Sequence, residues 1–348
     1  MTPERPRLGI TAFGTRIAAM ADAAAAADRA GYDTVWTSEL YNRSATVTLA
    51  AIAQATERCG VGAGILYGVG RSPLMLAAEA RDLDELSGGR FVLGLGNGTR
   101  RMISDWHGLD GSAPATRMEE LVPLVRAVWN LHERPIDHDG RFYRLKISSL
   151  GDLAPASQRS IPIYTAGVNP RMIETAGRVA DGLLGHTLFS PRYLREVVRP
   201  ALERGAAHAE RDPAEVALAT LTLAAVSDDE EQARREAAAM IAFYGSVKSY
   251  GGLFAACGFE AEAIRIQQAF AARDLDAMVS AVSDAMVDEF AITGRPDQVR
   301  AGLRRFDGLA DEVALSVPSF QISPERAAQM LDQLIEVCAP APDPTTTP

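Results

Sequence analysis

Residues 83–99 read LDELSGGRFVLGLGNGT, and they join the end of a helical segment to a short apolar run that finishes in glycines. The run Phe91–Gly96 has the length and the unbroken apolar character of a strand that is buried on both faces. The helical segment before it opens at Ser72-Pro73, where proline suits a first helical turn. A buried strand that alternates with helices is the repeating unit of a parallel sheet covered by helices.

Seven further runs share this character, and a segment with helical periodicity follows most of them; one such segment, Arg16 to Ala30, stops at Gly31. The runs are Leu8–Phe13, Thr34–Thr37, Val61–Leu66, Ile161–Ala166, Gly182–Gly185, Ala217–Ala225 and Glu312–Val317. Eight units favour a closed barrel over an open sheet, so we predict an α/β fold, a (β/α)8 TIM barrel. Such barrels reach about 250 residues or more as one domain. We therefore expect residues 1–338 to form a single domain.

Three segments lie outside the eight strand-and-helix units of the predicted barrel. Residues 228–290 are helix-prone and begin with acidic residues, which predicts a helical insertion between the seventh and eighth strands, near the active-site mouth. Its polar groups Tyr244, Lys248 and Tyr250 either contact substrate or lie exposed on helices. Residues 143–160 predict a second insertion that crosses the rim before the fifth strand. Residues 339–348, rich in proline and threonine, predict a disordered tail.

Composition narrows the classes of function. The formal net charge is -10 and no block of lysine and arginine occurs, so we expect a small-molecule partner and no nucleic acid. The charged N-terminus and the lack of an apolar run of about 18 residues predict a cytoplasmic protein with no membrane partner. The three cysteines are far apart and the five histidines lack metal-site spacing, so neither a disulfide framework nor a metal site is expected.

The candidate site residues follow the strands, because a barrel of this type places its chemistry at the carboxyl ends of its strands. Glu39 follows the second strand and is either a catalytic carboxylate or a solvated loop charge. The glycine-rich segment 62–73 predicts close approach of backbone to a ligand, with a mobile loop as the alternative. Phe13 either stacks on a planar ligand or plugs the barrel. Trp106-His107, placed in the loop after the fourth strand, is a weaker acid/base candidate.

Two further strand ends carry turn signals. Residues 94–99 read GLGNGT and lack the third glycine of a dinucleotide-binding fingerprint, so they indicate only a backbone loop against a planar cofactor. Residues 165–172 place small residues before a helix, where backbone N–H groups and the helix dipole favour a phosphate. Arg171 strengthens that prediction. A purely structural turn explains the same glycine and proline.

Taken in order, these segments resemble the luciferase-like monooxygenase superfamily, and within it the branch that uses the deazaflavin coenzyme F420, with the methylenetetrahydromethanopterin reductases most similar. The resemblance spans about residues 8–320. The segments that carry it are residues 30–39 (AGYDTVWTSE), 62–73, 83–96, 140–143 (GRFY), 161–164, 180–182 and 294–296 (GRP).

The resemblance implies a cis peptide between Gly64 and Ile65, which forms a bulge behind the deazaflavin ring. It also implies that Glu39 lies beside the ring. Further residues are implied to bind the cofactor: Tyr67, Asn97 and Gly98 at the ring, and Gly167, Val168, Arg171 and Met172 at the phosphate and ribityl chain. A homodimer is expected as well.

The chain departs from the F420-dependent sugar-phosphate dehydrogenases, which have Asp-His after the second strand and a glutamate in the fourth-strand loop. Here those positions read Glu39-Leu40 and Thr99. The resemblance therefore implies reduction of a C=N or C=C bond rather than sugar-phosphate oxidation, with Glu39 or a water as proton donor. An FMN-dependent monooxygenase and a non-catalytic flavin-binding protein are the two alternatives.

Overall fold

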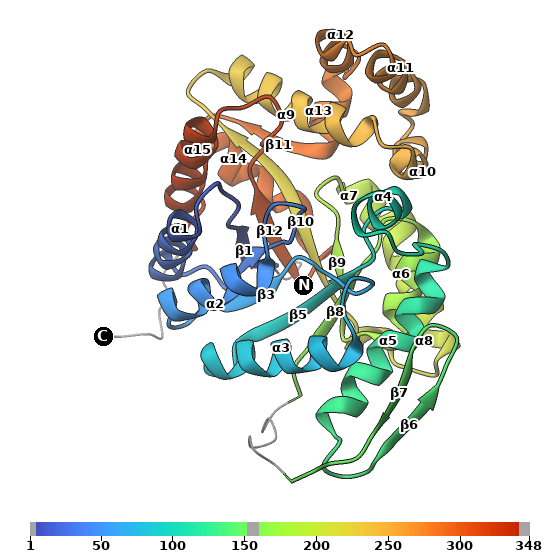
Figure 1. Cartoon of the computed structure of the whole chain (residues 1–348). Coiled ribbons are helices and arrows are strands. Elements are labelled where there is room, and N and C mark those ends of the chain that lie inside the picture. Colours follow the sequence, from blue (N-terminus) through green and yellow to red (C-terminus); the bar gives the residue numbers. More distant parts are fainter. Residues whose placement is uncertain (1–4, 152–159, 341–348) are drawn as a thin grey trace. The chain divides into compact units, whose positions relative to one another are not determined.

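The computed structural model describes residues 5–151 and 160–340 (Figure 1). It divides into two compact units, which we describe separately. Of the described residues, unit 1 contains 5–36, 185–200 and 218–340, and unit 2 contains 37–151, 160–184 and 201–217.

The strands of the main sheet pair in parallel, and all of them except β11 overlap the predicted apolar runs. They are β1 (Arg7–Thr11), β2 (Thr34–Thr37), β3 (Gly60–Ala63), β4 (Leu66–Tyr67), β5 (Phe91–Gly96), β8 (Ile163–Ala166), β9 (Gly182–Gly185), β10 (Ala217–Val226), β11 (Ala291–Gly294) and β12 (Glu312–Ser316). Their order is β11-β10-β12-β1-β2-β3-β5-β8-β9, and β10 also pairs with β9. This return of the pairing closes a (β/α)8 barrel, which confirms the predicted fold class.

In unit 1 a buried glutamate ties three strands together. Glu312 on β12 accepts hydrogen bonds from the indole Nε1 of Trp36 at 2.6 Å and from the hydroxyl of Thr34 at 3.1 Å, both on β2. Arg7, at the start of β1, lies 3.3 Å from the same carboxylate. Burial raises the pKa of the Glu312 carboxyl above its usual range, although these three partners oppose the shift.

The remainder of unit 1 is mostly helical. Its helices are α1 (Ile17–Ala30), α7 (Pro191–Tyr193), α9 (Glu230–Gly245), α10 (Gly251–Ala256), α11 (Glu260–Ala271), α12 (Leu275–Ser280), α13 (Asp284–Phe290), α14 (Pro296–Gly302) and α15 (Pro324–Val337). Gly31 ends α1 with a φ of 89°, as predicted. Helices α11, α12 and α13 pack against α9 (Figure 1), which confirms the helical character predicted for residues 228–290. Strand β11, which follows them, was not predicted.

In unit 2 the strands β3, β5, β8 and β9 pair in that order. The helices of this unit are α2 (Ala45–Ala55), α3 (Pro73–Leu86), α4 (Arg100–His107), α5 (Pro114–Trp129), α6 (Pro170–Val179) and α8 (Arg199–His208). Helix α3 opens at Ser72-Pro73, as predicted, and the Ser72 hydroxyl caps it by accepting a hydrogen bond from the N–H of Met75 at 3.2 Å. Helix α5 packs between α3 and α6.

Three sequence predictions need correction or lie outside the described residues. The predicted strand Val61–Leu66 is two strands, β3 and β4, because the chain bulges between them. The second insertion begins earlier than predicted, with an antiparallel hairpin of β6 (Ile136–Asp139) and β7 (Arg144–Ile147) beside α5 (Figure 1). Residues 152–159 of that insertion and residues 341–348 of the predicted tail lie outside the described part. The single-domain assignment stays a prediction.

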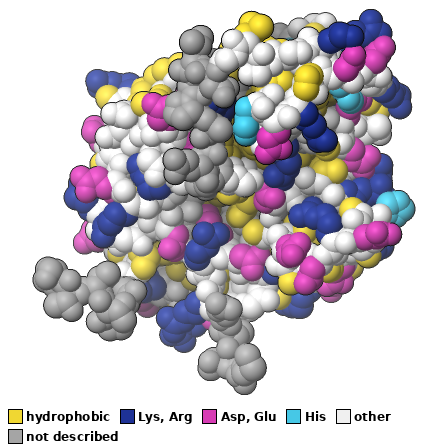
Figure 2. Space-filling view, turned by 90° about the horizontal axis from the view of Figure 1, so that it is seen from below, with side chains coloured by type: hydrophobic (Ala, Val, Ile, Leu, Met, Phe, Trp, Pro, Cys, Tyr) yellow, Lys and Arg dark blue, Asp and Glu magenta, His cyan; other side chains and the backbone are white. Residues whose placement is uncertain are grey.

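Two properties of the described residues concern the expectation that the protein has no membrane or nucleic-acid partner. None of their helices is both long enough and apolar enough to cross a membrane. Figure 2 shows acidic and basic side chains interspersed over the face that it draws.

Candidate functional site

The bulge between β3 and β4 is the central feature of unit 2. Gly62 pairs with Val92, and Leu66 pairs with Leu95. Four residue steps on one strand therefore match three on its neighbour, so one extra residue is accommodated between them. The peptide bond between Gly64 and Ile65 is cis, as the resemblance implies.

Glycines on β5 make room for this bulge. A Cβ placed on Gly94 would overlap the carbonyl oxygen of Ala63, and a Cβ on Gly96 would lie 2.7 Å from Cδ1 of Ile65. The apolar side chain of Ile65 is thus seated directly on the backbone of Gly96. This contact between strands explains why residues 94 and 96 are glycines.

Glu39 lies at this bulge and is held on both of its oxygens. Its backbone N–H donates to the carbonyl of Ile65 at 3.1 Å. Its Oε1 accepts from the N–H of Tyr67 at 2.8 Å and from Arg71 at 2.7 Å, and its Oε2 accepts from Arg71 at 2.5 Å. Only 9% of the Glu39 side chain is exposed. This bidentate pair is the strong, geometrically specific kind of ion pair.

Arg71 is the member of this network that sequence reasoning missed. Its Nε lies 3.1 Å from Oε2 of Glu79 on α3, so the guanidinium bridges two carboxylates. The hydrogen bond to Glu39 raises the pKa of Arg71 still further above its already high value. The only sequence signal was the position of Arg71 inside the glycine-rich segment, directly before the cap of α3.

Tyr67 connects the bulge to α4. Burial, with the Glu39 charge, raises the pKa of Tyr67 to about 12, so its hydroxyl stays protonated at neutral pH. Its ring meets the ring of His107 edge to face, with centroids 5.5 Å apart. Trp106 and His107 were placed in a loop, and that placement was wrong: they end helix α4, whose start is capped by Thr99.

Asn97 presents a polar atom without a partner. Its Nδ2 donates to the carbonyl of Pro114 at 3.1 Å, and the residue is only 8% exposed. Its buried Oδ1 has no hydrogen-bond partner in the described part of the chain. The next residue, Gly98, has a φ of +64°, and a Cβ there would lie 3.2 Å from the Tyr67 ring. Such an orphaned acceptor usually marks a ligand or an ordered water.

The start of α6 carries the last group of predicted residues. A Cβ on Gly167 would collide with the side chain of Met172, so the turn into the helix is too tight for any other residue. The side chain of Asn169 makes no cap hydrogen bond to this helix. Arg171 is half exposed and its Nη2 lies 3.1 Å from Glu119 on α5. Val168 lies in the turn itself.

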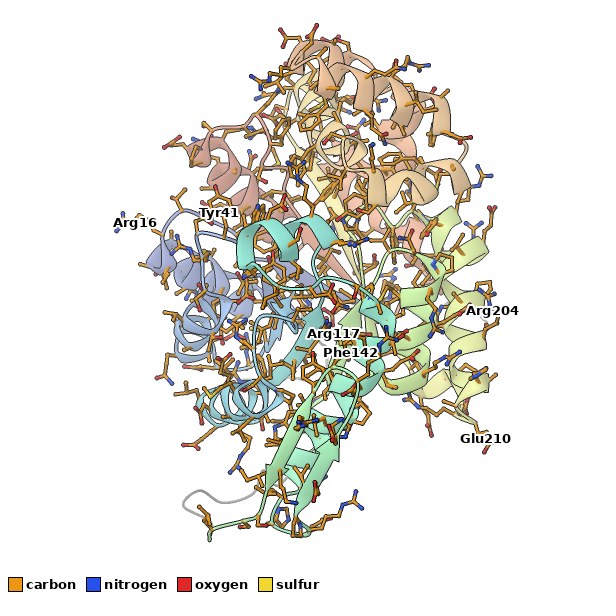
Figure 3. The ribbon with its side chains drawn as sticks, turned by 45° about the vertical axis from the view of Figure 1, so that its right-hand side comes forward. Arg16, Tyr41, Arg117, Phe142, Arg204 and Glu210 are labelled. Atoms are coloured by element: carbon orange, nitrogen blue, oxygen red, sulfur yellow. The ribbon has the colours of Figure 1, made fainter. Side chains whose placement is uncertain are left out.

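The hairpin motif GRFY, residues 140–143, contacts helix α5 and the loop after β4 in unit 2. Glu120 on α5 accepts the backbone N–H of Phe142 at 3.1 Å and of Tyr143 at 2.9 Å. The guanidinium of Arg117 lies 4.3 Å above the Phe142 ring (Figure 3). The hydroxyl of Tyr143 donates to the carbonyl of Gly68 at 3.5 Å. The hairpin therefore contacts the loop that follows the bulge.

A separate cluster lies in unit 1. The ring of His186, directly after β9, meets the rings of Tyr244 and Tyr250 at 4.4 Å and 4.6 Å. Burial lowers the pKa of His186 to about 3, so it is neutral at physiological pH. Of the three polar groups predicted in the helical insertion, the two tyrosines thus pack on a histidine, while Lys248 is exposed.

No group of three or more potential metal ligands occurs among residues 5–151 and 160–340. Unit 2 brings Glu39, Gly64, Ile65, Tyr67 and Gly98 together around one bulge, and Asn97 stands between Gly96 and Gly98 in the chain. Gly167, Val168, Arg171 and Met172 are grouped separately at the start of α6.

Comparison with known proteins identifies similar chains. The model of the luciferase-like monooxygenase family matches residues 1–312. A 5,10-methylenetetrahydromethanopterin reductase of Methanolobus tindarius is 30% identical, over 79% of this chain and 82% of its own. A Mycobacterium tuberculosis protein whose name proposes a coenzyme F420-dependent oxidoreductase is 28% identical, over 80% of this chain and 85% of its own. The solved coenzyme F420-dependent tetrahydromethanopterin reductase of Methanopyrus kandleri superposes with a TM-score of 0.78, at 24% identity, over 96% of this chain and 98% of that one.

Proposed function

Because the chain belongs to the luciferase-like monooxygenase family, we propose that it is an oxidoreductase that uses coenzyme F420 to reduce a small organic substrate. We propose a C=N or C=C bond as the hydride acceptor, since the chain lacks the Asp-His pair and the loop glutamate associated with sugar-phosphate oxidation. The relatives named for F420 chemistry support this choice of coenzyme. When bound, the reduced deazaflavin supplies the hydride.

The observation that carries the proposal is the unpartnered Oδ1 of Asn97. A buried acceptor left without a partner costs about 1–3 kcal/mol, and the ring N–H groups of a deazaflavin would satisfy it. In the chain Asn97 stands between Gly96, whose backbone lies against Ile65, and Gly98, whose backbone lies against the Tyr67 ring. These residues fit one planar, polar-edged ring.

The start of α6 is the part of unit 2 that suits the coenzyme phosphate. The backbone N–H groups of a first helical turn, together with the helix dipole, favour an anion there. Gly167 allows the tight turn, and Val168 and Met172 flank it with apolar surface. Arg171 adds positive charge that Glu119 partly offsets.

The chain's own groups then have distinct roles. Asn97 would accept a ring N–H of the bound coenzyme, Ile65 would support its ring, and Tyr67 offers a hydroxyl that stays protonated. Glu39 and Arg71 hold the backbone of the bulge in place. Because both Glu39 oxygens already accept hydrogen bonds, we propose that a water rather than Glu39 donates the proton to the reduced substrate.

A binding titration tests the coenzyme. The purified protein is titrated separately with F420 and with FMN, and binding is followed by the fluorescence of each compound. We expect saturable, stoichiometric binding of F420 and much weaker binding of FMN. Tight FMN binding with turnover that depends on NADPH and oxygen, and no F420 binding, would overturn the proposal in favour of a monooxygenase.

Turnover separates the enzyme from a non-catalytic flavin-binding protein. Reduced F420 is mixed with the protein and a panel of imines and conjugated enones, and its reoxidation is followed by absorbance. We expect protein-dependent reoxidation with at least one substrate class. Stoichiometric coenzyme binding without reoxidation by any of them would favour the binding protein.

A further inference from the structure

Two exposed aromatic side chains adjoin the Glu39 network and have no part in the function proposed above. Tyr41 is 72% exposed and Trp106 is 48% exposed, yet their rings meet edge to face with centroids 5.6 Å apart. Tyr41 stands two residues after Glu39, and Figure 3 labels it beside helix α4. Exposed large aromatic rings in contact are uncommon on a surface that serves only solubility.

The backbone around each ring is ordered by its own contacts. Leu40 and Arg43 exchange backbone hydrogen bonds of 3.1 Å in both directions, so Tyr41 occupies the corner of a tight turn. Trp106 lies in the last turn of α4, which Gly108 ends in the left-handed conformation. The two rings therefore meet from two different strand-end segments, after β2 and after β5.

A closed circuit of contacts joins this pair to the candidate coenzyme site. Glu39 accepts the N–H of Tyr67, and the Tyr67 ring meets His107 at 5.5 Å. His107 is the neighbour of Trp106, whose ring meets Tyr41. All members of this circuit belong to unit 2.

The circuit offers aromatic surface, and the charged side chains Arg101 and Asp105 next to it on α4 are paired at 3.0 Å. The Arg71 guanidinium is paired with Glu39 on two atoms and with Glu79 on a third. Leu40 is next to Tyr41 in the chain and Leu109 follows Trp106 by three residues, and they are 46% and 41% exposed. Edge-to-face aromatic pairs are able to receive a further planar ring by stacking or edge contact.

From this juxtaposition we infer that Tyr41 and Trp106 form the substrate-binding wall, and that the substrate is an uncharged molecule with an aromatic ring conjugated to the reducible bond. The inference rests on the proposed function, because it assigns the substrate class for the same site. In this arrangement the two rings take the planar apolar part of the substrate.

The test uses binding, so that it does not depend on turnover. The protein is labelled with 5-fluorotryptophan, and its three tryptophan ¹⁹F resonances are assigned with Trp→Phe variants. Benzylideneacetone, a planar aromatic enone, is the probe, and 4-cyclohexylbutan-2-one is its saturated counterpart. We expect benzylideneacetone to shift the resonance of Trp106 saturably and to leave buried Trp36 unmoved, and the saturated ketone to bind at least fivefold more weakly.

Variants sharpen the result. Tyr41→Ala is expected to weaken the affinity for benzylideneacetone at least fivefold, Tyr41→Phe to retain it, and Phe270→Ala, which removes a ring that is 51% exposed in unit 1, to leave it unchanged. An unmoved Trp106 resonance, or equal affinity for the two ketones, would overturn the inference. F420 is titrated into the same samples: failure of F420 binding with an intact Trp106 response sinks the proposed coenzyme alone, whereas intact F420 binding without that response sinks the wall alone.

Discussion

The role of Glu39 is left open by the sequence, and its hydrogen-bond partners are given by the structure. Its position after the second strand marks it as a site residue, but the sequence leaves its role open. In the structure the Arg71 guanidinium donates hydrogen bonds to both carboxylate oxygens of Glu39, and the N–H of Tyr67 donates to one of them. The pair is largely withdrawn from water, so removal of one partner leaves an uncompensated charge.

We expect Glu39→Gln and Arg71→Met each to lower the free energy of unfolding by about 1–3 kcal/mol, because each leaves a partly buried group unpaired. The double variant should lose less than the sum of the two, with a coupling of about 1–2 kcal/mol. Urea unfolding of the four proteins measures this cycle. Additive effects would show that the pair does not act as a unit.

A substitution of Asn97 should affect the affinity for F420 more strongly than the free energy of unfolding. Asn97→Ala is expected to lower the affinity for F420 about tenfold, while the stability falls by only about 1 kcal/mol, for the one hydrogen bond to Pro114. Asn130→Ala is the matched control, because Asn130 stands at the opposite end of α5 from Pro114. Fluorescence titration with F420 and urea unfolding check both effects. Equal F420 affinities in the two variants would contradict the role of Asn97.

At the scale of elements, the bulge between β3 and β4 depends on the glycines of β5. Gly96→Ala is expected to lower both stability, by about 1–3 kcal/mol, and F420 affinity, because the new Cβ meets Cδ1 and Cγ1 of Ile65. Ile65→Ala in the same chain removes those atoms and should recover part of the stability. Gly251→Ala, where nothing lies within 4 Å, is the control and should be neutral or slightly stabilising. Thermal unfolding compares the three variants with the wild type.

The contacts of Glu312 among β1, β2 and β12 predict a pH dependence. Because the folded state raises the pKa of this carboxyl, the folded chain holds the proton more tightly than the unfolded chain. Its contribution to stability is present below about pH 4.5 and is lost as the pH rises through the folded pKa. Glu312→Gln keeps an oxygen for Trp36 and removes this titration.

The stability of Glu312→Gln relative to the wild type should therefore rise as the pH increases. Urea unfolding at several values between about pH 4 and pH 8 measures the difference. Glu289→Gln, on another element of unit 1, controls for general charge removal. A difference that falls with pH would contradict the assignment.

At the scale of the whole molecule, we propose a homodimer. Helices α2 and α3 contact each other and leave apolar side chains exposed, at 57% for Val47, 52% for Met75 and 44% for Leu86. Apolar surface on neighbouring helices is suited to burial against a second copy. Light scattering is expected to give twice the 37.2 kDa mass of the chain. Met75→Glu should shift the mass toward the monomer, whereas Phe270→Glu, on α11, should not.

The strands could be located from sequence because a buried parallel strand is a short apolar run, and such a run depends on nearby residues only. Runs such as Phe91–Gly96 and Gly182–Gly185 match their strands to the residue. The hairpin β6–β7 was not predicted from the sequence, because its strands are exposed and carry charged residues such as Asp137, Arg144 and Lys146. Its order comes from contacts with α5, which no local pattern encodes.

By itself, the sequence determined the barrel, the order of its eight apolar strand segments, and the strand ends where candidate residues stand, because periodicity and glycine placement are local properties. Only the tertiary structure decided that Arg71 pairs with Glu39, that Oδ1 of Asn97 is left without a partner, and that Tyr41 meets Trp106. Each of these facts depends on side chains brought together from separate strand ends. The distances between these side chains depend on how the strands pack against one another. The spacing of the residues along the chain does not predict those distances.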